Sequence, residues 1–459
     1  MIIKQQLKPH LLEALFIMLL IISIISYSII QLESVPHIPI LISICLLILY
    51  GVIKKVPYQS LEKSMVSSVS TSISAIYIFL LIGILISSWL ISGTIPTLLY
   101  IGFSIVSASF FYAIVFIITS IIGTAIGSSL TTVATVGVAM IGVATSIEAS
   151  IFITAGAIVS GAFFGDKMSP LSDTTNLASS IVGIDLFTHI RNMMFTTVPV
   201  FILSLIGYAI LSPSSETIDG QLITQYKETL IATNLVQWYA IIPLFLLILC
   251  TVLKVPSMAT LAISAMSGII LSYFHSSISL QQLFMILYEG FTLNTGVEAI
   301  DSLLSRGGMN SMLFTIILIV LSLSMGGLLF ALGIIQTLLQ SIQTLLTSIG
   351  KVITGSALTA IFINIVIGEQ YLSLLLTGEA YKEKFKSMKL HPKNLARVIE
   401  DAGTVINPLV PWSVCGLFIA STLEVSVIDY LPFAFFCLLS PIMTILFGWL
   451  NITITKETH

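Results

Sequence analysis

Residues 73–91 have the sequence ISAIYIFLLIGILISSWLI, without a charged residue or a histidine. They lie within a longer stretch, from Ser64 to Ile147, that contains no Asp, Glu, Lys, Arg or His at all. At about 20 residues for each bilayer crossing, this stretch holds roughly four membrane spans. Its long apolar runs do not alternate between apolar and polar residues, as the strands of a membrane barrel do. The sequence therefore predicts an all-α polytopic membrane protein.

The composition of the whole chain agrees with this prediction and excludes several classes of protein. Of the 459 residues, 56% are hydrophobic and 8% are charged, whereas a soluble domain carries about 25% charged residues. The net charge of -3 and the lack of a long polybasic run argue against a nucleic-acid partner. No cysteine or histidine pair has metal-ligand spacing, and no nucleotide-binding or hydrolase motif occurs. We therefore expect no catalytic residues, no cofactor and no metal beyond a transported ion.

The apolar runs between loop signals give the expected membrane spans. Three further segments, 123–144, 161–180 and 401–421, are apolar overall but rich in Gly, Ser, Thr and Pro. This composition predicts broken or re-entrant helices around a polar site inside the protein. The expected spans lie near residues 11–30, 38–53, 73–91, 98–119, 149–164, 192–211, 235–252, 255–273, 311–332, 352–368 and 427–448.

The charged loops predict how the chain lies in the membrane. Lys and Arg collect in the cytoplasmic loops of membrane proteins. Lys4 and Lys8 precede the first span, and residues 382–397 contain six Lys and Arg residues, whereas residues 212–234 are net acidic. We therefore expect both termini and the 382–397 loop in the cytoplasm, and the 212–234 loop outside the cell.

A shift of 241 residues superposes backbone-determining residues of the first half on those of the second. Under this shift the acidic turn at Glu148 falls on the basic 382–397 loop, so equivalent loops are expected on opposite sides of the membrane. We therefore predict two inverted repeats, residues 1–211 and 235–459, joined by the external loop 212–234. The alternative is a chance match between two apolar sequences. The matching pairs are Gly127 with Gly368, Gly137 with Gly378, Pro170 with Pro411, Ser172 with Ser413 and Gly207 with Gly448.

The strongest ion-binding signal of the first half is the segment 165–176, GDKMSPLSDTTN. Its proline prevents a continuous helix where two carboxylates, hydroxyls and an amide are gathered. An ionised Asp at the bilayer centre costs about 2.5–3.5 kcal/mol, so it persists with a partner or a function. Several oxygen ligands suit a small hard cation, so we expect Asp166, Asp173 and Asn176 to bind Na+ or H+. The supporting hydroxyls and helix break are expected at Ser169, Pro170 and Thr174.

The second half repeats this device in the segment 400–413, EDAGTVINPLVPWS. Two prolines and a glycine make a continuous helix implausible there. The shift places Asn407 opposite Asp166, so one carboxylate has become a neutral amide, and this asymmetry fits one dominant ion site. We expect Asp401 and Asn407 to take part in ion or proton binding. The supporting residues are Thr404, Pro408, Pro411 and Ser413.

Each of these acids also has a structural interpretation. Asp166 and Lys167 are compatible with an interfacial ion pair, and Asp173 with a helix N-cap. One of Glu400 and Asp401 is compatible with a salt-bridged surface acid near the cytoplasm.

A third pair of segments contains further candidates. Residues 127–137, GSSLTTVATVG, have five hydroxyls between two glycines and no charge, a composition that also suits simple helix packing. The equivalent segment of the second half contains Glu369, which follows an apolar run. Burial disfavours a charged carboxylate, so Glu369 is a candidate proton carrier. The candidate hydroxyls of the first segment are Ser128, Thr131 and Thr132.

Motifs along nearly the whole chain resemble those of the NhaC family of bacterial Na+/H+ antiporters. The resemblance implies the ion transporter superfamily fold with inverted repeats, a homodimer and an elevator-like movement. It implies Na+ and H+ as transported ions, and some members of the family exchange organic acids such as malate and lactate. The motifs that carry the resemblance are 92–96 SGTIP, 165–178 GDKMSPLSDTTNLA, 185–190 DLFTHI, 306–309 RGGM and 400–404 EDAGT.

These observations favour a secondary antiporter in the bacterial cell membrane, which expels Na+ in exchange for H+ by competition at Asp166 and Asp173. The alternative transporter is an Na+/H+-coupled exchanger of a small organic acid, whose carboxylate would bind half-helix N-termini and hydroxyls such as Ser128. An ion channel would pass one ion without requiring protons. An integral-membrane enzyme is a further alternative, but the sequence contains no nucleophile and base constellation for it.

Overall fold

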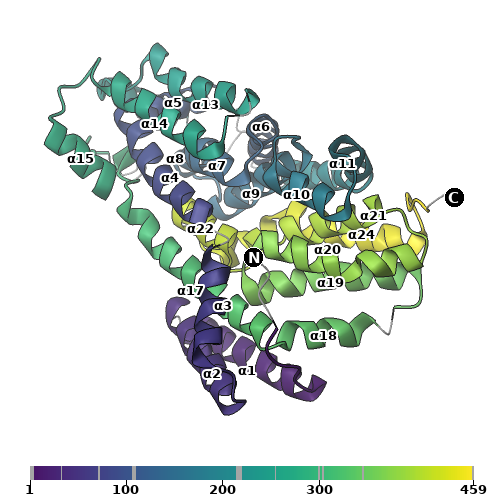
Figure 1. Cartoon of the computed structure of the whole chain (residues 1–459). Coiled ribbons are helices and arrows are strands. Elements are labelled where there is room, and N and C mark those ends of the chain that lie inside the picture. The colour runs from purple at the N-terminus through teal and green to yellow at the C-terminus, as the bar shows by residue number, and fades with distance from the viewer. Residues whose placement is uncertain are drawn as a thin grey trace.

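The computed structural model describes residues 5–32, 34–70, 73–105, 110–212, 220–253, 255–297, 300–301, 304–343 and 346–456. Within these ranges the elements are helices, apart from one isolated bridge between Leu390 and Lys456 (Figure 1). The predicted all-α class is therefore confirmed.

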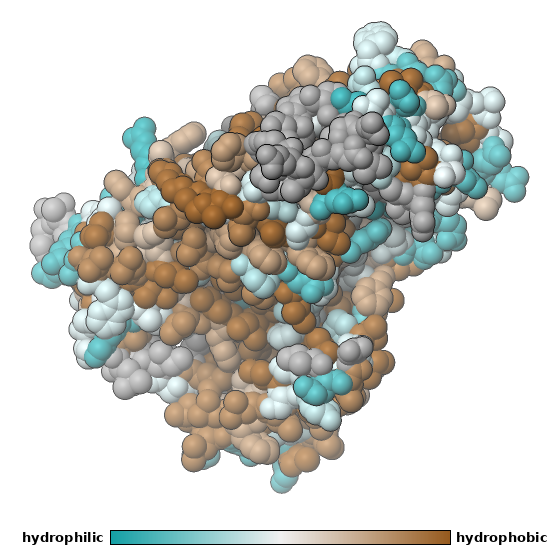
Figure 2. Space-filling model, turned by 180° about the vertical axis from the view of Figure 1, so that it is seen from behind, coloured by the Kyte–Doolittle hydropathy of each residue, from teal (hydrophilic) through white to brown (hydrophobic). Residues whose placement is uncertain are grey.

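Several of these helices are long and apolar enough to cross a membrane. Within the described ranges there are six such helices, and up to nine spans if each bent pair of helices counts as one. Figure 2 shows hydrophobic side chains over most of one face, with hydrophilic side chains gathered toward its edges. The chain is therefore a multi-pass membrane protein. The six single helices are Leu11–Ile29, Ser129–Ser146, Ile151–Met168, Leu186–Leu211, Met309–Ala331 and Ile349–Ile367.

The spans predicted at 98–119 and 427–448 are both interrupted, the second by a bend of 57° between Val427–Phe433 and Phe435–Leu450. Helix α5 (Thr94–Ile105) ends inside the first range, and α6 (Phe111–Ile126) begins after Phe110. Phe110 has a left-handed φ of 66°, which a continuing α-helix does not allow. The segment 123–144, expected to be broken, is interrupted at Gly127, and its continuation Ser129–Ser146 is long and apolar enough to cross a membrane and is 89% buried inside the protein.

Two sets of interrupted helices meet at the centre of the molecule, one from each half of the chain (Figure 1). The first set consists of α6, α7 (Ser129–Thr132), the π-helix η1 (Val133–Gly137), α8 (Val138–Ser146), α9 (Ile151–Met168), α10 (Asp173–Val182) and α11 (Leu186–Leu211). The second set consists of α19 (Ile349–Ile367), α20 (Gln370–Ser387), α21 (Lys393–Ile399), η5 (Glu400–Thr404), η6 (Asn407–Leu409), α22 (Val414–Leu423), α23 (Val427–Tyr430), η7 (Leu431–Phe433) and α24 (Phe435–Leu450).

The remaining helices pack around this centre in two groups (Figure 1). The first group is α1 (Leu11–Ile30), α2 (His37–Ile53), α3 (Tyr58–Ser70), α17 (Leu313–Ala331) and α18 (Ile334–Gln343). The second group is α4 (Ile73–Ile91), α5, α13 (Ile242–Val252), α14 (Ser257–Ser272) and α15 (Leu280–Glu289). In the segment expected to link the two halves, residues 213–219 lie outside the described ranges, and Gly220–Ala232 forms α12.

Helix breaks occur at two positions that the shift of 241 residues pairs. Gly127 ends α6 with a φ of 71°, and Gly368 ends α19 with a φ of 75°. This left-handed conformation suits glycine, which has no Cβ. The next residue in each half, Ser128 or Glu369, is an N-cap whose side chain accepts the backbone N–H three residues later. The predicted helix breaks at these positions are therefore confirmed.

The close packing of α6 against α9 depends on glycine. A Cβ at Gly165 would lie 2.4 Å from the Thr124 backbone nitrogen and 2.5 Å from the Gly123 carbonyl carbon. Small residues allow membrane helices to approach this closely. The approach brings the C-terminal end of α9, with Asp166, against the helix break at Gly127.

Candidate functional site

Asp166 lies in the last turn of α9, where the chain leaves the helix, and is 2% exposed. Its Oδ2 accepts a hydrogen bond of 2.7 Å from the hydroxyl of Ser129. Ser129 is the first residue of α7, which follows the helix break at Gly127. The Oδ1 of Asp166 has no hydrogen-bond partner among the described residues. A buried carboxylate oxygen without a partner is costly, so the arrangement favours a proton or a cation at Oδ1.

Asp173 differs from Asp166 in being exposed. Its Oδ1 accepts the Thr174 backbone N–H at 3.0 Å, and its Oδ2 accepts the Tyr371 hydroxyl of α20. The N-cap of α10 is Ser172, whose hydroxyl accepts the Thr175 N–H, so the interpretation of Asp173 as the cap residue is wrong. Asp173 instead occupies the first turn, where its charge suits the helix dipole, and its bond to Tyr371 joins the two halves.

Lys167 and Asp401 form an ion pair between α9 and η5, and both side chains are 0% exposed. The second carboxylate oxygen of Asp401 accepts the Thr196 hydroxyl at 2.8 Å and also the Thr444 hydroxyl. The interpretation of Lys167 as an interfacial partner of Asp166 is therefore wrong. Both Asp401 oxygens therefore have partners, and these partners lie on α9, α11 and α24, so Asp401 connects the three helices.

Glu400, directly before Asp401, was absent from the candidate set. Its side chain is 0% exposed, so neither residue is the surface acid that the sequence allowed. Its Oε1 accepts hydroxyl groups from Thr174 at 3.1 Å and Thr404 at 3.0 Å, which places both candidate threonines in this site. The interrupted segment 400–413 was the available signal, because it begins with Glu400, which lies in the π-helix η5.

Glu369 and Asn407 lie at the breaks of the second half, and both are buried. Glu369 Oε2 accepts the Leu372 backbone N–H at 2.7 Å. Asn407 donates to Asn364 Oδ1 at 2.8 Å and accepts the Cys415 N–H at 3.0 Å, so both ends of its amide are bonded. Around it, Pro408 accepts the Tyr430 hydroxyl at its carbonyl, Pro411 precedes α22, and Ser413 caps α22.

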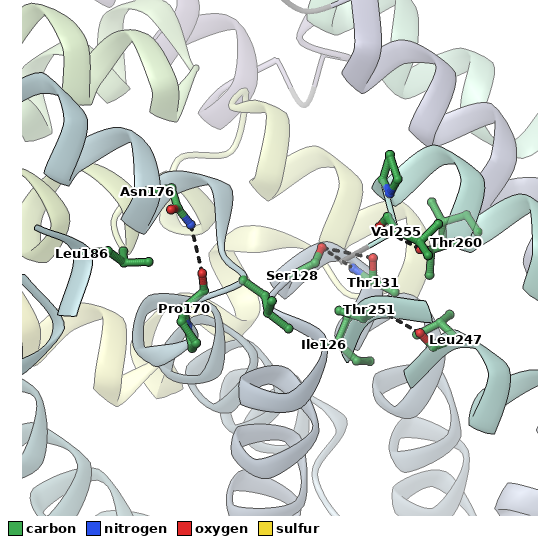
Figure 3. Close-up of a pocket in the computed structure, with 14 residues that line it drawn as sticks. Ile126, Ser128, Thr131, Pro170, Asn176, Leu186, Leu247, Thr251, Val255 and Thr260 are labelled. Atoms are coloured by element: carbon green, nitrogen blue, oxygen red, sulfur yellow. Dashed lines mark hydrogen bonds between the residues drawn. The ribbon is translucent and has the colours of Figure 1, made fainter. Parts of the chain in front are cut away.

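A cavity of about 370 Å³ opens beside the first helix break. Figure 3 shows Asn176 and Pro170 on one side of it and Thr251 and Thr260 on the other, with Ser128 between them. Asn176 donates to the Pro170 carbonyl at 3.1 Å. No sequence signal pointed to Thr251 and Thr260, because only the packing of α13 and α14 brings them to this cavity.

Three other candidate hydroxyls bond locally. Thr131 lines the cavity and donates to the Ser128 hydroxyl at 3.0 Å. Thr132 donates to the Ser128 carbonyl at 2.8 Å, one turn back along the chain. Ser169 accepts the Leu171 N–H at 3.2 Å. The bonds of Thr132 and Ser169 shape the breaks and match the packing interpretation.

Comparisons with known proteins agree on one group of transporters. The sequence model described as the Na+/H+ antiporter family matches residues 161–452. The chain is 42% identical to Na+/H+ antiporter NhaC of Alkalihalophilus pseudofirmus over 95% of this chain and 94% of that protein. It is 38% identical to Na+/H+ antiporter NhaC of Bacillus subtilis, over 95% of this chain and 97% of that protein. Its identity to the malate-2H+/Na+-lactate antiporter of Bacillus subtilis is 31%, over 96% of this chain and 95% of that protein.

Proposed function

The chain belongs to the Na+/H+ antiporter family, and on this premise we propose that it expels Na+ from a bacterial cell in exchange for H+. The observation that carries the proposal is Asp166, a buried carboxylate whose Oδ1 has no partner among the described residues. A proton and Na+ exclude one another at such a carboxylate. Alternating exposure of one site to the two sides of the membrane then couples the two fluxes without ATP.

The other candidate residues have different parts in this proposal. Asp173 and Asn176 are exposed at the far end of the same segment, so they would be the first oxygen ligands that a cation meets. Asp401 and Asn407 are fully bonded within the protein, so they would hold the interrupted helices in place. Further oxygen ligands for a cation at Asp166 must therefore come from other groups, whose oxygens have no hydrogen-bond partner.

Two inverted repeats, 1–211 and 235–459, form the second part of the proposal. It is supported by the equivalent helix breaks and by α10 and α22, which have the same length, begin after a serine cap and stand 241 residues apart. Inverted repeats place the ion site near mid-membrane, where their broken helices meet. The elevator-like movement and the homodimer stay predictions from the family resemblance.

The orientation of the chain is the first testable prediction. Cysteine at Lys386 is expected to react with a membrane-impermeant maleimide only from the cytoplasmic side, and cysteine at Glu228 only from outside. Both side chains are exposed, and positive loops stay in the cytoplasm. The backbone N–H of His391, in the basic loop, donates a hydrogen bond of 3.0 Å to the carbonyl of Thr455. We therefore expect the C-terminus on the same side of the membrane as Lys386. Labelling of both cysteines from one side would contradict the orientation and the inverted repeats.

An exchanger of organic anions is the second candidate, and the cavity favours it. Its hydroxyl groups, from Ser128, Thr131, Thr251 and Thr260, would bind a carboxylate. In this case the anion would occupy the cavity while the cation binds at Asp166.

One experiment tests both candidates. Purified protein in proteoliposomes with a pH dye inside is given an outside pulse of Na+, K+, malate or lactate. We expect internal alkalinisation after Na+ alone, since entering Na+ exchanges for internal protons. A response that requires malate or lactate would favour the organic-anion exchanger, and no response to any pulse would reject both.

The proton carrier is the second testable prediction. Glu369→Ser removes the carboxylate but keeps an N-cap, as Ser128 does at the equivalent position. We expect this variant to fold and to lose Na+-driven proton movement, whereas Glu369→Asp keeps cap, charge and exchange. The measurement is internal pH after an Na+ pulse, with melting temperature as the control. Normal exchange by Glu369→Ser would make Glu369 a structural cap and leave the proton to Asp166.

A further inference from the structure

Glu400 is a buried acid that the proposed exchange does not yet use. It begins η5, and its side chain is 0% exposed. Its Oε1 accepts two hydroxyl groups, from Thr174 and Thr404, but its Oε2 has no partner among the described residues. Buried carboxylate oxygens are normally bonded. The two threonines thus hold the carboxylate in one orientation and leave one oxygen free.

The free oxygen of Glu400 belongs to the same region as that of Asp166. Lys167, next to Asp166, is paired with Asp401, next to Glu400, so this ion pair joins α9 to η5, the two elements that contain the other two acids. Thr174, from the same 165–176 segment as Asp166, donates its hydroxyl to Glu400 Oε1 at 3.1 Å. Among the described residues, Asp166 Oδ1 and Glu400 Oε2 are the fully buried carboxylate oxygens without a hydrogen-bond partner.

Within the described ranges, neither Asp166 nor Glu400 forms a salt bridge with a cation. Lys167 is occupied by Asp401, and Arg397 donates to the Thr453 hydroxyl at 2.8 Å. His189 of α11 is buried and neither ring nitrogen has a partner among the described residues. Two carboxylates without a counter-charge in the protein interior are strongly unfavourable, and a bound cation relieves this.

The following inference rests on the proposed function and deepens it. We infer that Glu400 is a second carboxylate ligand of the transported Na+, binding it through Oε2 together with Oδ1 of Asp166. Thr174 and Thr404 are positioning residues, because they bond the other oxygen of Glu400. A small hard cation takes several oxygen ligands, so a pair of carboxylates at a helix break suits it.

The test is equilibrium binding of radioactive Na+ to the purified full chain in detergent. We expect Glu400→Gln to raise the Kd for Na+ by at least about ten-fold, since ligands and their oriented partners affect metal affinity on this scale. The matched control is Glu379→Gln, which removes an exposed carboxylate of α20 and should leave the Kd unchanged. Unaltered affinity in Glu400→Gln would overturn the inference.

Two further variants keep the test decisive if Glu400→Gln does not fold. Thr404→Val removes a hydroxyl that orients Glu400, and Thr174→Val removes one that orients Glu400 and also bonds the Ser172 hydroxyl at 3.0 Å. Both variants should weaken Na+ binding. Wild-type affinity in both variants would overturn the inference. Failure of the proposed function is distinguishable, because the wild-type chain itself would then show no Na+-driven change of internal pH.

Discussion

Asp166→Asn is expected to abolish exchange of Na+ for H+, to below about 1% of the wild-type rate, a loss of roughly 2.7 kcal/mol or more. The amide keeps the shape of the side chain and still accepts the 2.7 Å bond from Ser129. It loses the negative charge that both transported cations require. The measurement is the initial rate of internal alkalinisation in proteoliposomes after an Na+ pulse, at equal protein content.

A matched control uses the same substitution close by in the chain. Asp185→Asn changes an exposed acid that caps α11 by accepting the Thr188 N–H at 2.9 Å. Asparagine is an equally good N-cap, so this variant should exchange normally. If Asp166→Asn retained more than about half of the wild-type rate, the ion site would have to lie elsewhere in the chain.

Lys167→Met is expected to destabilise the folded protein by about 3–5 kcal/mol, because it leaves Asp401 buried without its counter-charge. The pair is fully buried, and Met fills a similar volume, so charge rather than packing dominates the effect. The measurement is the melting temperature in detergent. Adding Asp401→Asn to this variant should recover part of the loss, since the interior then contains neither charge.

An exposed ion pair of the same chain provides the comparison. Lys54 and Glu13 lie 2.5 Å apart, with side chains 42% and 27% exposed. Exposed pairs contribute about 0–1 kcal/mol, so Lys54→Met should change the melting temperature little. A loss in Lys167→Met no larger than that in Lys54→Met would show that the buried pair does not hold the two halves together.

The local features of the fold could be predicted from the sequence. A stretch without charges predicts membrane helices, because charged groups are costly in lipid, and left-handed glycines and prolines interrupt helices wherever they stand. The breaks at Gly127 and Gly368 and the burial of Asp166 follow from such local rules. The span predicted at 98–119 failed because hydropathy does not report the left-handed turn at Phe110.

The sequence by itself thus determined the all-α membrane class and the interrupted segments, and it singled out Asp166, an acid that the structure buries, since each depends on the solvation and backbone conformation of a few neighbouring residues. Only the tertiary structure decided which charges pair. Lys167 bonds Asp401 across 234 positions instead of its neighbour Asp166, because adjacent residues of a helix point in different directions. The same packing left Glu400, rather than Asp401, with a free oxygen, and in a low-dielectric interior such long-range contacts decide where a cation binds.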